Sequence, residues 1–264
     1  MTVNNMTQDN TLLAQTVIEV LEEFAPLSFQ EKWDNAGLLV GSPYDKVKKA
    51  LLTLDVTEAV VDEAIGCGAD MIISHHPLIF TPLKSLGGKS DTERAVIKAI
   101  KNDILIYASH TNMDVAVGGV SYKMGEKIEL ENMRPFTESG LGVIGELKNS
   151  QSVNHFVTML KKAFAAPMVR YTKTEKQICR VALCGGSGAE FIECALAAGV
   201  DAYISADFKY HDFFKAEGRF AMVDIGHFES EQYTLEIFYD ILSKKLPNFA
   251  IQFTSVNSNP INYL

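Results

Sequence analysis

The sequence predicts an α/β fold made of two similar domains, each with a mainly parallel sheet flanked by helices. Short apolar runs of strand length alternate with amphipathic stretches of helix length, as in α/β proteins. Several predicted strands are apolar at every position, which is expected where helices cover both faces of a parallel sheet. The second half of the chain also repeats part of the first half.

The individual elements follow from apolar periodicity and from residues that stop helices. The first helix is expected at about residues 12–24, where apolar residues recur along one stripe and Pro26 follows. Apolar strands are expected at 38–40, 49–54, 71–73 and 104–108, with further helices at about 56–65, 92–101 and 230–245. Two helices have the pattern of a capping box, namely Asp55 with Glu58 and Ser90 with Glu93.

An internal repeat indicates that the two halves are related. Residues 68–74 read GADMIIS and residues 199–205 read GVDAYIS, 131 positions further along. At the same offset the predicted strand 50–54 falls on 181–185, without a gap. A second match pairs 104–110 with 221–227. We interpret these matches as an internal duplication.

Composition excludes several classes of function. The chain has 24 basic and 33 acidic residues and a net charge of −9, which disfavours direct nucleic-acid or anionic-membrane binding and suits the attraction of metal cations. No apolar run approaches the roughly 20 residues of a membrane helix, and the polar residues 1–10 do not resemble a signal peptide. The four cysteines form no CxxC pair, so we expect buried, reduced thiols and a cytoplasmic protein.

Side chains that commonly bind metals follow three of the predicted strands. They are His75 with His76, His110 with Asp114, and His227 with Glu231. Parallel sheets place ligands at the carboxyl ends of their strands, so these residues are expected to lie near one another. The repeat has Ala206 and Asp207 where the first half has the two adjacent histidines, so the scaffold does not require that pair. We therefore assign it to chemistry.

Imidazole and carboxylate together suit Zn, Fe, Mn or Co. His227 and Glu231 are four residues apart and face the same side of a helix. His75 and His76 would point to opposite faces of a regular strand, so either the chain bends at Pro77 or each serves a different metal. Two metals about 3.5–4 Å apart need a bridging carboxylate, which Glu231 or Asp114 can supply. His110 has a role as an orienting residue or a proton carrier.

Four other features leave alternatives open. The glycine-rich segment 183–188 either binds phosphate at a helix N-terminus or is a tight turn without a ligand, which its lack of a Lys-Ser/Thr ending favours. Trp33, followed by Asp34 and Asn35, is either a core residue or a stacking platform for a base. His211 either lines the cleft or is structural, and His155 is expected on a helix surface.

Five motifs resemble the family of GTP cyclohydrolase type-two homologues, also called the Ngg-one-interacting-factor-like family. They occur in the family's order and lie at 33–38, 74–77, 109–114, 184–188 and 226–231, with a further match at Asn259-Pro260. The chain resembles the short form, without the domain that longer members carry between the halves.

The resemblance implies a dinuclear metal centre, with five ligands that fall on His75, His76, Asp114, His227 and Glu231 and with Glu231 bridging. It also implies that the chain returns to its first domain, so we expect one domain at 1–128 plus 222–264 and the other at 129–221. A toroidal homohexamer, a trimer of dimers with the sites facing the inner cavity, is a third implication. The family name further implies hydrolytic opening of the guanine ring of GTP.

The favoured function is therefore a metal-dependent hydrolase that uses two divalent metal ions to activate water against a nucleotide or related small molecule. His110 and Glu231 are the expected catalytic residues. A non-catalytic metal carrier or metal-dependent regulatory protein is the alternative, and a structural ring with a vestigial site is the third.

Overall fold

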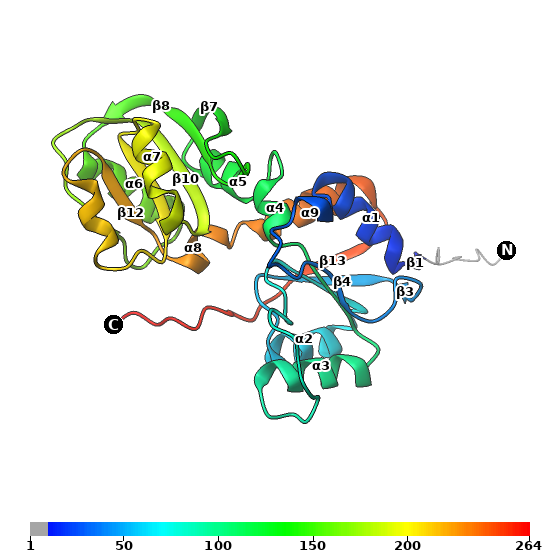
Figure 1. Ribbon diagram of the computed structural model, residues 1–264. Helices are drawn as coiled ribbons and strands as arrows, with labels where there is room; N and C mark the ends of the chain where they lie inside the picture. Colours follow the sequence, from blue (N-terminus) through cyan, green and yellow to red (C-terminus); the bar gives the residue numbers. More distant parts are fainter. Residues whose placement is uncertain (1–9) are drawn as a thin grey trace. The chain divides into compact units, whose positions relative to one another are not determined.

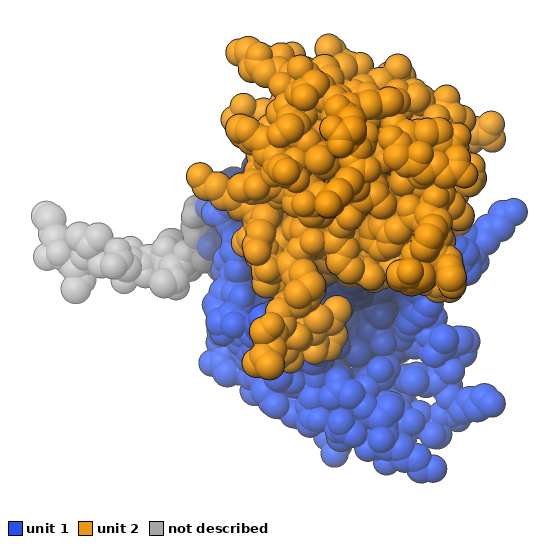
Figure 2. Space-filling model, turned by 90° about the vertical axis from the view of Figure 1, so that its left-hand side faces the viewer, with its two compact units in different colours: residues 1–27, 32–110, 238–258 blue, residues 28–31, 111–237, 259–264 orange. Residues whose placement is uncertain are grey.

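The computed structural model describes residues 10–264, which form two compact units (Figures 1 and 2). Unit 1 contains the described residues up to Leu27 together with 32–110 and 238–258, and unit 2 contains 28–31, 111–237 and 259–264. Both units have a sheet flanked by helices, so the predicted α/β class is confirmed. The domain boundaries expected from the family, 1–128 plus 222–264 and 129–221, stay a prediction.

Unit 1 is built on a five-stranded sheet. In spatial order its strands are β13 (Ala250–Phe253), β4 (Lys49–Thr53), β5 (Met71–Ser74), β6 (Leu105–Ala108) and β2 (Gly37–Val40). The first four run parallel, and β2 pairs antiparallel with β6. A separate short ribbon pairs β1 (Leu12–Leu13) with β3 (Lys46–Val47).

Helices cover both faces of this sheet, which explains its apolar strands. In Figure 1, α2 (Glu58–Cys67) and α3 (Asp91–Lys101) lie on one face, and α1 (Ala14–Phe24) and α9 (Thr234–Lys245) lie on the other. Leu51, Ile72 and Ile106 pack into the core under α2 and α3. The residues next to them in each strand are also fully buried, because successive side chains point to opposite faces. Each such burial contributes about 1.5–3 kcal/mol.

Unit 2 has a six-stranded sheet. Its strands, in spatial order, are β7 (Leu130–Pro135), β8 (Val143–Gln151), β10 (Ile178–Ser187), β11 (Ala202–Ala206), β12 (Ala221–Asp224) and β9 (Arg170–Tyr171). β10, β11 and β12 run parallel, and the other pairs are antiparallel. Both units thus contain three parallel strands followed by an antiparallel edge strand. The register of β4 with β5 recurs between β10 and β11 at the repeat offset of 131. The second match is shifted by one residue, because Met71 lies opposite Leu105 whereas Ala202 lies opposite Ala221.

The parallel strands of unit 2 also divide their side chains between two cores. Val181 and Leu183 belong to the core that includes α5 (Val120–Lys127) and α6 (Val153–Ala163). Ala182 and Cys184 belong to a second core, with α7 (Ile192–Ala197). The remaining short elements are α4 (Thr111–Val115), α8 (His227–Glu231), η1 (Leu27–Phe29), η2 (Ala189–Phe191) and η3 (Asp212–Ala216).

Local contacts correct two of the expected helices. The Ser90 cap is confirmed, since its Oγ accepts from the backbone N–H of Glu93 at 3.1 Å. The Asp55 cap is wrong, because Thr57 caps α2 instead. The helix expected at 230–245 is also wrong as one element, because the chain forms α8 and then α9.

Surface and redox features agree with the sequence only in part. None of the helices between residues 10 and 264 is long and apolar enough to cross a membrane. His155 is exposed on α6, as expected. All four cysteines are free thiols, but Cys184 alone is fully buried and Cys194 is exposed, so the prediction of buried thiols was wrong for Cys194.

Glu63 on α2 fixes the segment that follows β13. Its carboxylate accepts hydrogen bonds from the backbone N–H of Ser255 at 2.8 Å, from the Ser255 hydroxyl at 2.6 Å and from the Thr254 hydroxyl. Burial raises the pKa of Glu63, but the hydrogen bonds together lower it by more, so the pKa lies below its ordinary value. A carboxyl group with a lowered pKa stabilises the fold above its unfolded-state pKa, and this contribution is lost as pH falls through the folded-state pKa.

We therefore expect Glu63→Gln to lower the free energy of unfolding by about 1 kcal/mol at pH 7. The deficit should shrink as the pH is lowered from 7 towards 3, because protonation of the wild-type carboxyl removes the charge that these hydrogen bonds stabilise. Urea denaturation at both pH values measures it, with exposed Glu175→Gln as the matched control. A deficit of the same size at both pH values would contradict this account.

Candidate metal centre

Unit 1 brings three imidazole rings together at the carboxyl ends of two neighbouring strands. His75 and His76 follow β5, and His110 lies two residues beyond β6. The two strands are parallel, with Ser74 opposite Ala108, so the residues after them are neighbours. One ring nitrogen of each histidine lies within 4.8 Å of the other two, and the ring centroids are 5.0–5.4 Å apart.

This arrangement shows how both adjacent histidines reach one cluster, while the alternative that each serves a different metal stays a prediction. β5 ends at Ser74, so the chain leaves regular strand geometry before the histidine pair. The rings of His75 and His76 therefore do not point to opposite faces, and both join one cluster.

Each ring of the cluster is held at Nδ1 by an oxygen atom. The partners are the Ser109 carbonyl for His75 at 3.0 Å, the Asp55 carboxylate for His76 at 2.7 Å and the Asp34 carboxylate for His110 at 2.7 Å. A carbonyl or an ionised carboxylate can only accept, so Nδ1 carries the proton in each ring. A neutral ring then presents the lone pair of Nε2, which is the usual arrangement of a metal-binding histidine.

Unit 2 contributes a second group of metal-binding side chains. His227 and Glu231 are one turn apart on α8, with His227 Nε2 3.1 Å from Glu231 Oε2. His227 is also held at Nδ1, by the carboxylate of Asp207 at 2.7 Å. Asp114 lies on α4, and its carboxylate has an oxygen within 4.8 Å of one of Glu231. This group is richer in carboxylate than the group in unit 1.

The electrostatics of His227 reflect its two acidic neighbours. Burial lowers the pKa of the ring, but the Glu231 charge and the hydrogen bond to Asp207 raise it more, to about 11. The hydrogen bond to His227 in turn lowers the pKa of Asp207. The raised pKa favours a doubly protonated ring in the metal-free protein at neutral pH, with the Nε2 proton on the side of Glu231. A divalent cation can replace that proton, so the donor set fits a metal ion.

The glycine-rich segment supports Glu231 rather than a phosphate. Gly186 has φ of +61°, and a Cβ there would lie 2.2 Å from Glu231 Oε1. Its N–H donates to Ser230 Oγ at 2.9 Å, and its carbonyl accepts from Ser205 Oγ at 3.0 Å. The segment continues β10 up to Ser187. These contacts favour the interpretation without a ligand.

The residues that hold the rings were missed by sequence reasoning. The sequence assigns no role to Asp34 beside Trp33, and it predicts that Asp55 caps a helix. Asp207 was noted as the counterpart of His76 in the repeat, and that position was the available signal. Its φ of +59° is uncommon outside glycine but tolerated by Asp.

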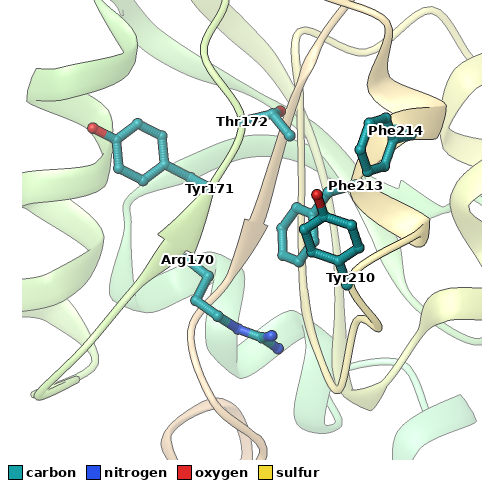
Figure 3. A pocket seen from close by; sticks show the side chains of 6 residues that line it. All are labelled: Arg170, Tyr171, Thr172, Tyr210, Phe213 and Phe214. Carbon is teal, nitrogen blue, oxygen red and sulfur yellow. The ribbon is translucent and has the colours of Figure 1, made fainter.

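Two other predicted features lie on the surface. Trp33 is 59% exposed, so the interpretation as a core residue is wrong. His211 is also exposed, with its ring centroid 5.2 Å from that of Tyr210. Tyr210 helps to line an open pocket of about 390 Å³ in unit 2 (Figure 3). The pocket's other lining residues are Arg170, Tyr171, Thr172, Phe213 and Phe214, so none of the expected metal ligands lines it.

Comparison with known proteins identifies relatives over nearly the whole chain. Residues 12–260 match the Duf34/NIF3 (NGG1p interacting factor 3) family. A Campylobacter jejuni protein named GTP cyclohydrolase 1 type 2 homolog is 31% identical over 253 residues, covering 94% of this chain and 98% of its own length. A Clostridium acetobutylicum protein of the same name is 32% identical over 247 residues, covering 89% and 90%.

Solved structures with a similar fold also cover nearly the whole chain. A Bacillus cereus protein related to NIF3 has a TM-score of 0.87 at 24% identity, covering 95% of this chain and 99% of its own, which supports the fold. Reduced HcgD from Methanocaldococcus jannaschii has a TM-score of 0.81 at 28% identity, covering 93% and 99%.

The Asp207 hydrogen bond should strengthen metal binding at His227. We expect Asp207→Asn to weaken Zn²⁺ or Co²⁺ binding by about 10–100-fold, because the ring loses a charged acceptor. Calorimetric titration of the metal-free protein measures this effect. Asp212→Asn, in the same loop but without a histidine contact, is the control and should bind normally. Equal affinities for the two variants would show that Asp207 has no such role.

Proposed function

The chain belongs to the Duf34/NIF3 family, and on this premise we propose that it is a hydrolase that uses two divalent metal ions to activate water against a nucleotide or related small molecule. One observation carries the proposal. Four histidines in the described residues, His75, His76, His110 and His227, are each held at Nδ1 by an oxygen acceptor. A hydrogen-bond acceptor at Nδ1 fixes the tautomer of a histidine that binds a metal through Nε2. Structural histidines do not all need an acceptor at the same ring nitrogen.

We assign five residues to one dinuclear centre. His75 and His76 are ligands from unit 1, and Asp114, His227 and Glu231 are ligands from unit 2, with Glu231 bridging. The assignment rests on the sequence motifs and on the family resemblance. The chemistry of each donor group supports it, because imidazole and carboxylate suit Zn, Fe, Mn and Co.

The chemistry that divalent cations supply in such a site is Lewis acidity, which lowers the pKa of water from about 15.7 to near 7. The chain's own residues orient and move protons. Asp34 holds His110 Nδ1, so Nε2 of that ring is the atom that accepts or returns a proton during hydrolysis. The Glu231 carboxylate, which has oxygens close to His227 and Asp114, would supply the negative charge that holds the cations.

The substrate class follows from the names of the relatives. Relatives that cover most of this chain are named GTP cyclohydrolase 1 type 2 homolog, which favours a nucleotide. A ring-shaped homohexamer and a cytoplasmic location stay predictions.

Removal of single ligands tests the proposal. We expect protein purified without added metal and then loaded to hold about two metal ions per chain, and His75→Ala or Glu231→Gln to lower this number and abolish turnover. Mass spectrometry of the metal and a screen of nucleotides and phosphoesters on the same sample measure both quantities. The control is His155→Ala, an exposed residue on α6. Turnover that persists in both ligand variants would defeat the hydrolase, and exchangeable metal without turnover would indicate a carrier instead.

Metal binding should also depend on pH in a defined direction. Because the pKa of metal-free His227 is raised to about 11, binding must displace a proton, so apparent affinity should rise with pH between 6 and 9. For one proton the rise is about tenfold per pH unit. Calorimetry in buffers with different ionisation enthalpies counts the protons released. Affinity that does not change over this range would contradict the assignment of His227.

A further inference from the structure

Two large aromatic side chains are exposed beside the histidine cluster of unit 1. Trp33 is 59% exposed and Phe80 is 51% exposed. Their ring centroids are 5.8 Å apart, and the rings are tilted by 54°, so they do not cover each other's faces. Neither side chain contributes much to core packing, because both lie largely outside the core. Exposed aromatic residues grouped in this way commonly mark a binding surface.

Hydrogen bonds connect the two loops that carry these exposed rings. The Asp34 side chain is fully buried and accepts from the N–H of Asn35 at 2.7 Å. The Asn35 side-chain amide donates to the carbonyl of Ile79, next to Phe80, at 2.6 Å. The two loops are therefore tied to each other. Loops connected in this way lose less conformational entropy when a ligand arrives than separate loops would.

The loop that carries Trp33 is also connected to His110. The Asp34 carboxylate that supports the Trp33 loop also holds His110 Nδ1 at 2.7 Å. The His110 ring centroid is 6.0 Å from that of Trp33 and 6.3 Å from that of Phe80, with the edge of one ring towards the face of the other. Small-molecule sites combine aromatic walls with a few polar groups in this manner.

We propose that Trp33 and Phe80 form a stacking site for a planar heteroaromatic ring and so select substrates that carry such a ring. The proposal rests on the proposed function, because it assumes that His75, His76 and His110 serve a substrate. The tilt between the rings leaves the indole face available to a flat ligand, while Phe80 bounds the site from the side. Stacking on aromatic residues accepts any base, because every base has a π-face. Polar groups of the histidine cluster would then meet the atoms that react.

The chain offers a direct measurement, because Trp33 is its single tryptophan. We titrate the full-length protein, with and without Zn²⁺, with guanosine monophosphate and with ribose 5-phosphate, and record tryptophan fluorescence. The nucleotide should quench the signal saturably, and the sugar phosphate, which lacks the base, should not. Phe80→Leu should raise the nucleotide Kd by about tenfold or more.

Matched variants separate stacking from folding defects. Trp33→Phe keeps an aromatic ring and should retain binding by calorimetry, whereas Trp33→Leu should lose it. Phe214→Leu removes an aromatic side chain that is 62% exposed in unit 2 and should leave the Kd unchanged. Once a substrate is known, Phe80→Leu should raise KM and leave kcat close to that of the wild type.

Several results would overturn the stacking site. They are equal quenching by both ligands, an unchanged Kd in Phe80→Leu, and a fluorescence change that follows protein concentration alone, which would indicate that a second copy covers the rings. Turnover with no base-dependent binding would refute this inference and leave the proposed function standing. Base-dependent binding with no turnover in any screen would refute the proposed function and leave the stacking site standing.

Discussion

The hydrogen bond from Nδ1 of each site histidine to an oxygen acceptor is the constraint on which the candidate centre depends. It leaves Nε2 of each ring as the nitrogen that can bind a metal, and it fixes the direction in which that nitrogen points. The acceptors come from separate loops, such as those of Asp34 and Asp55, so the surrounding chain must be in place before the donor atoms are. The parallel register of β5 and β6 helps to place these loops, because it brings the ends of both strands to the same edge of the sheet.

The internal duplication shows how one scaffold supports two kinds of donor group. At the repeat offset of 131, Asp207 occupies the position of His76, and the second match pairs His110 with His227. In unit 1 these positions hold two imidazoles of one cluster, and in unit 2 they hold a carboxylate that orients an imidazole. The scaffold therefore preserves the neighbourhood of two side chains, while the residue types decide whether both can bind a metal or one supports the other.

The fold and the candidate donors were predictable because both follow from simple periodicity. Apolar strands identify a covered sheet, and ligand-type residues directly after such strands must gather at its edge. The supporting residues were not predictable, because their role is set by neighbours distant in sequence. Asp55 has the sequence pattern of a helix cap, yet its carboxylate pairs with His76, from beyond the next strand. Trp33 is apolar enough for a core, and only the packing of its loop decides that it is exposed.

Gly186 carries a consequence for the evolution of this chain. The carboxylate of Glu231 occupies the space where any side chain at position 186 would begin, and the backbone there has a dihedral angle that favours glycine. A mutation at this position would thus disturb Glu231 without touching any of the donor residues themselves. In a survey of genomes, a relative that keeps every donor residue but has lost this glycine would be a candidate for a protein that is losing its ability to bind metal at this centre.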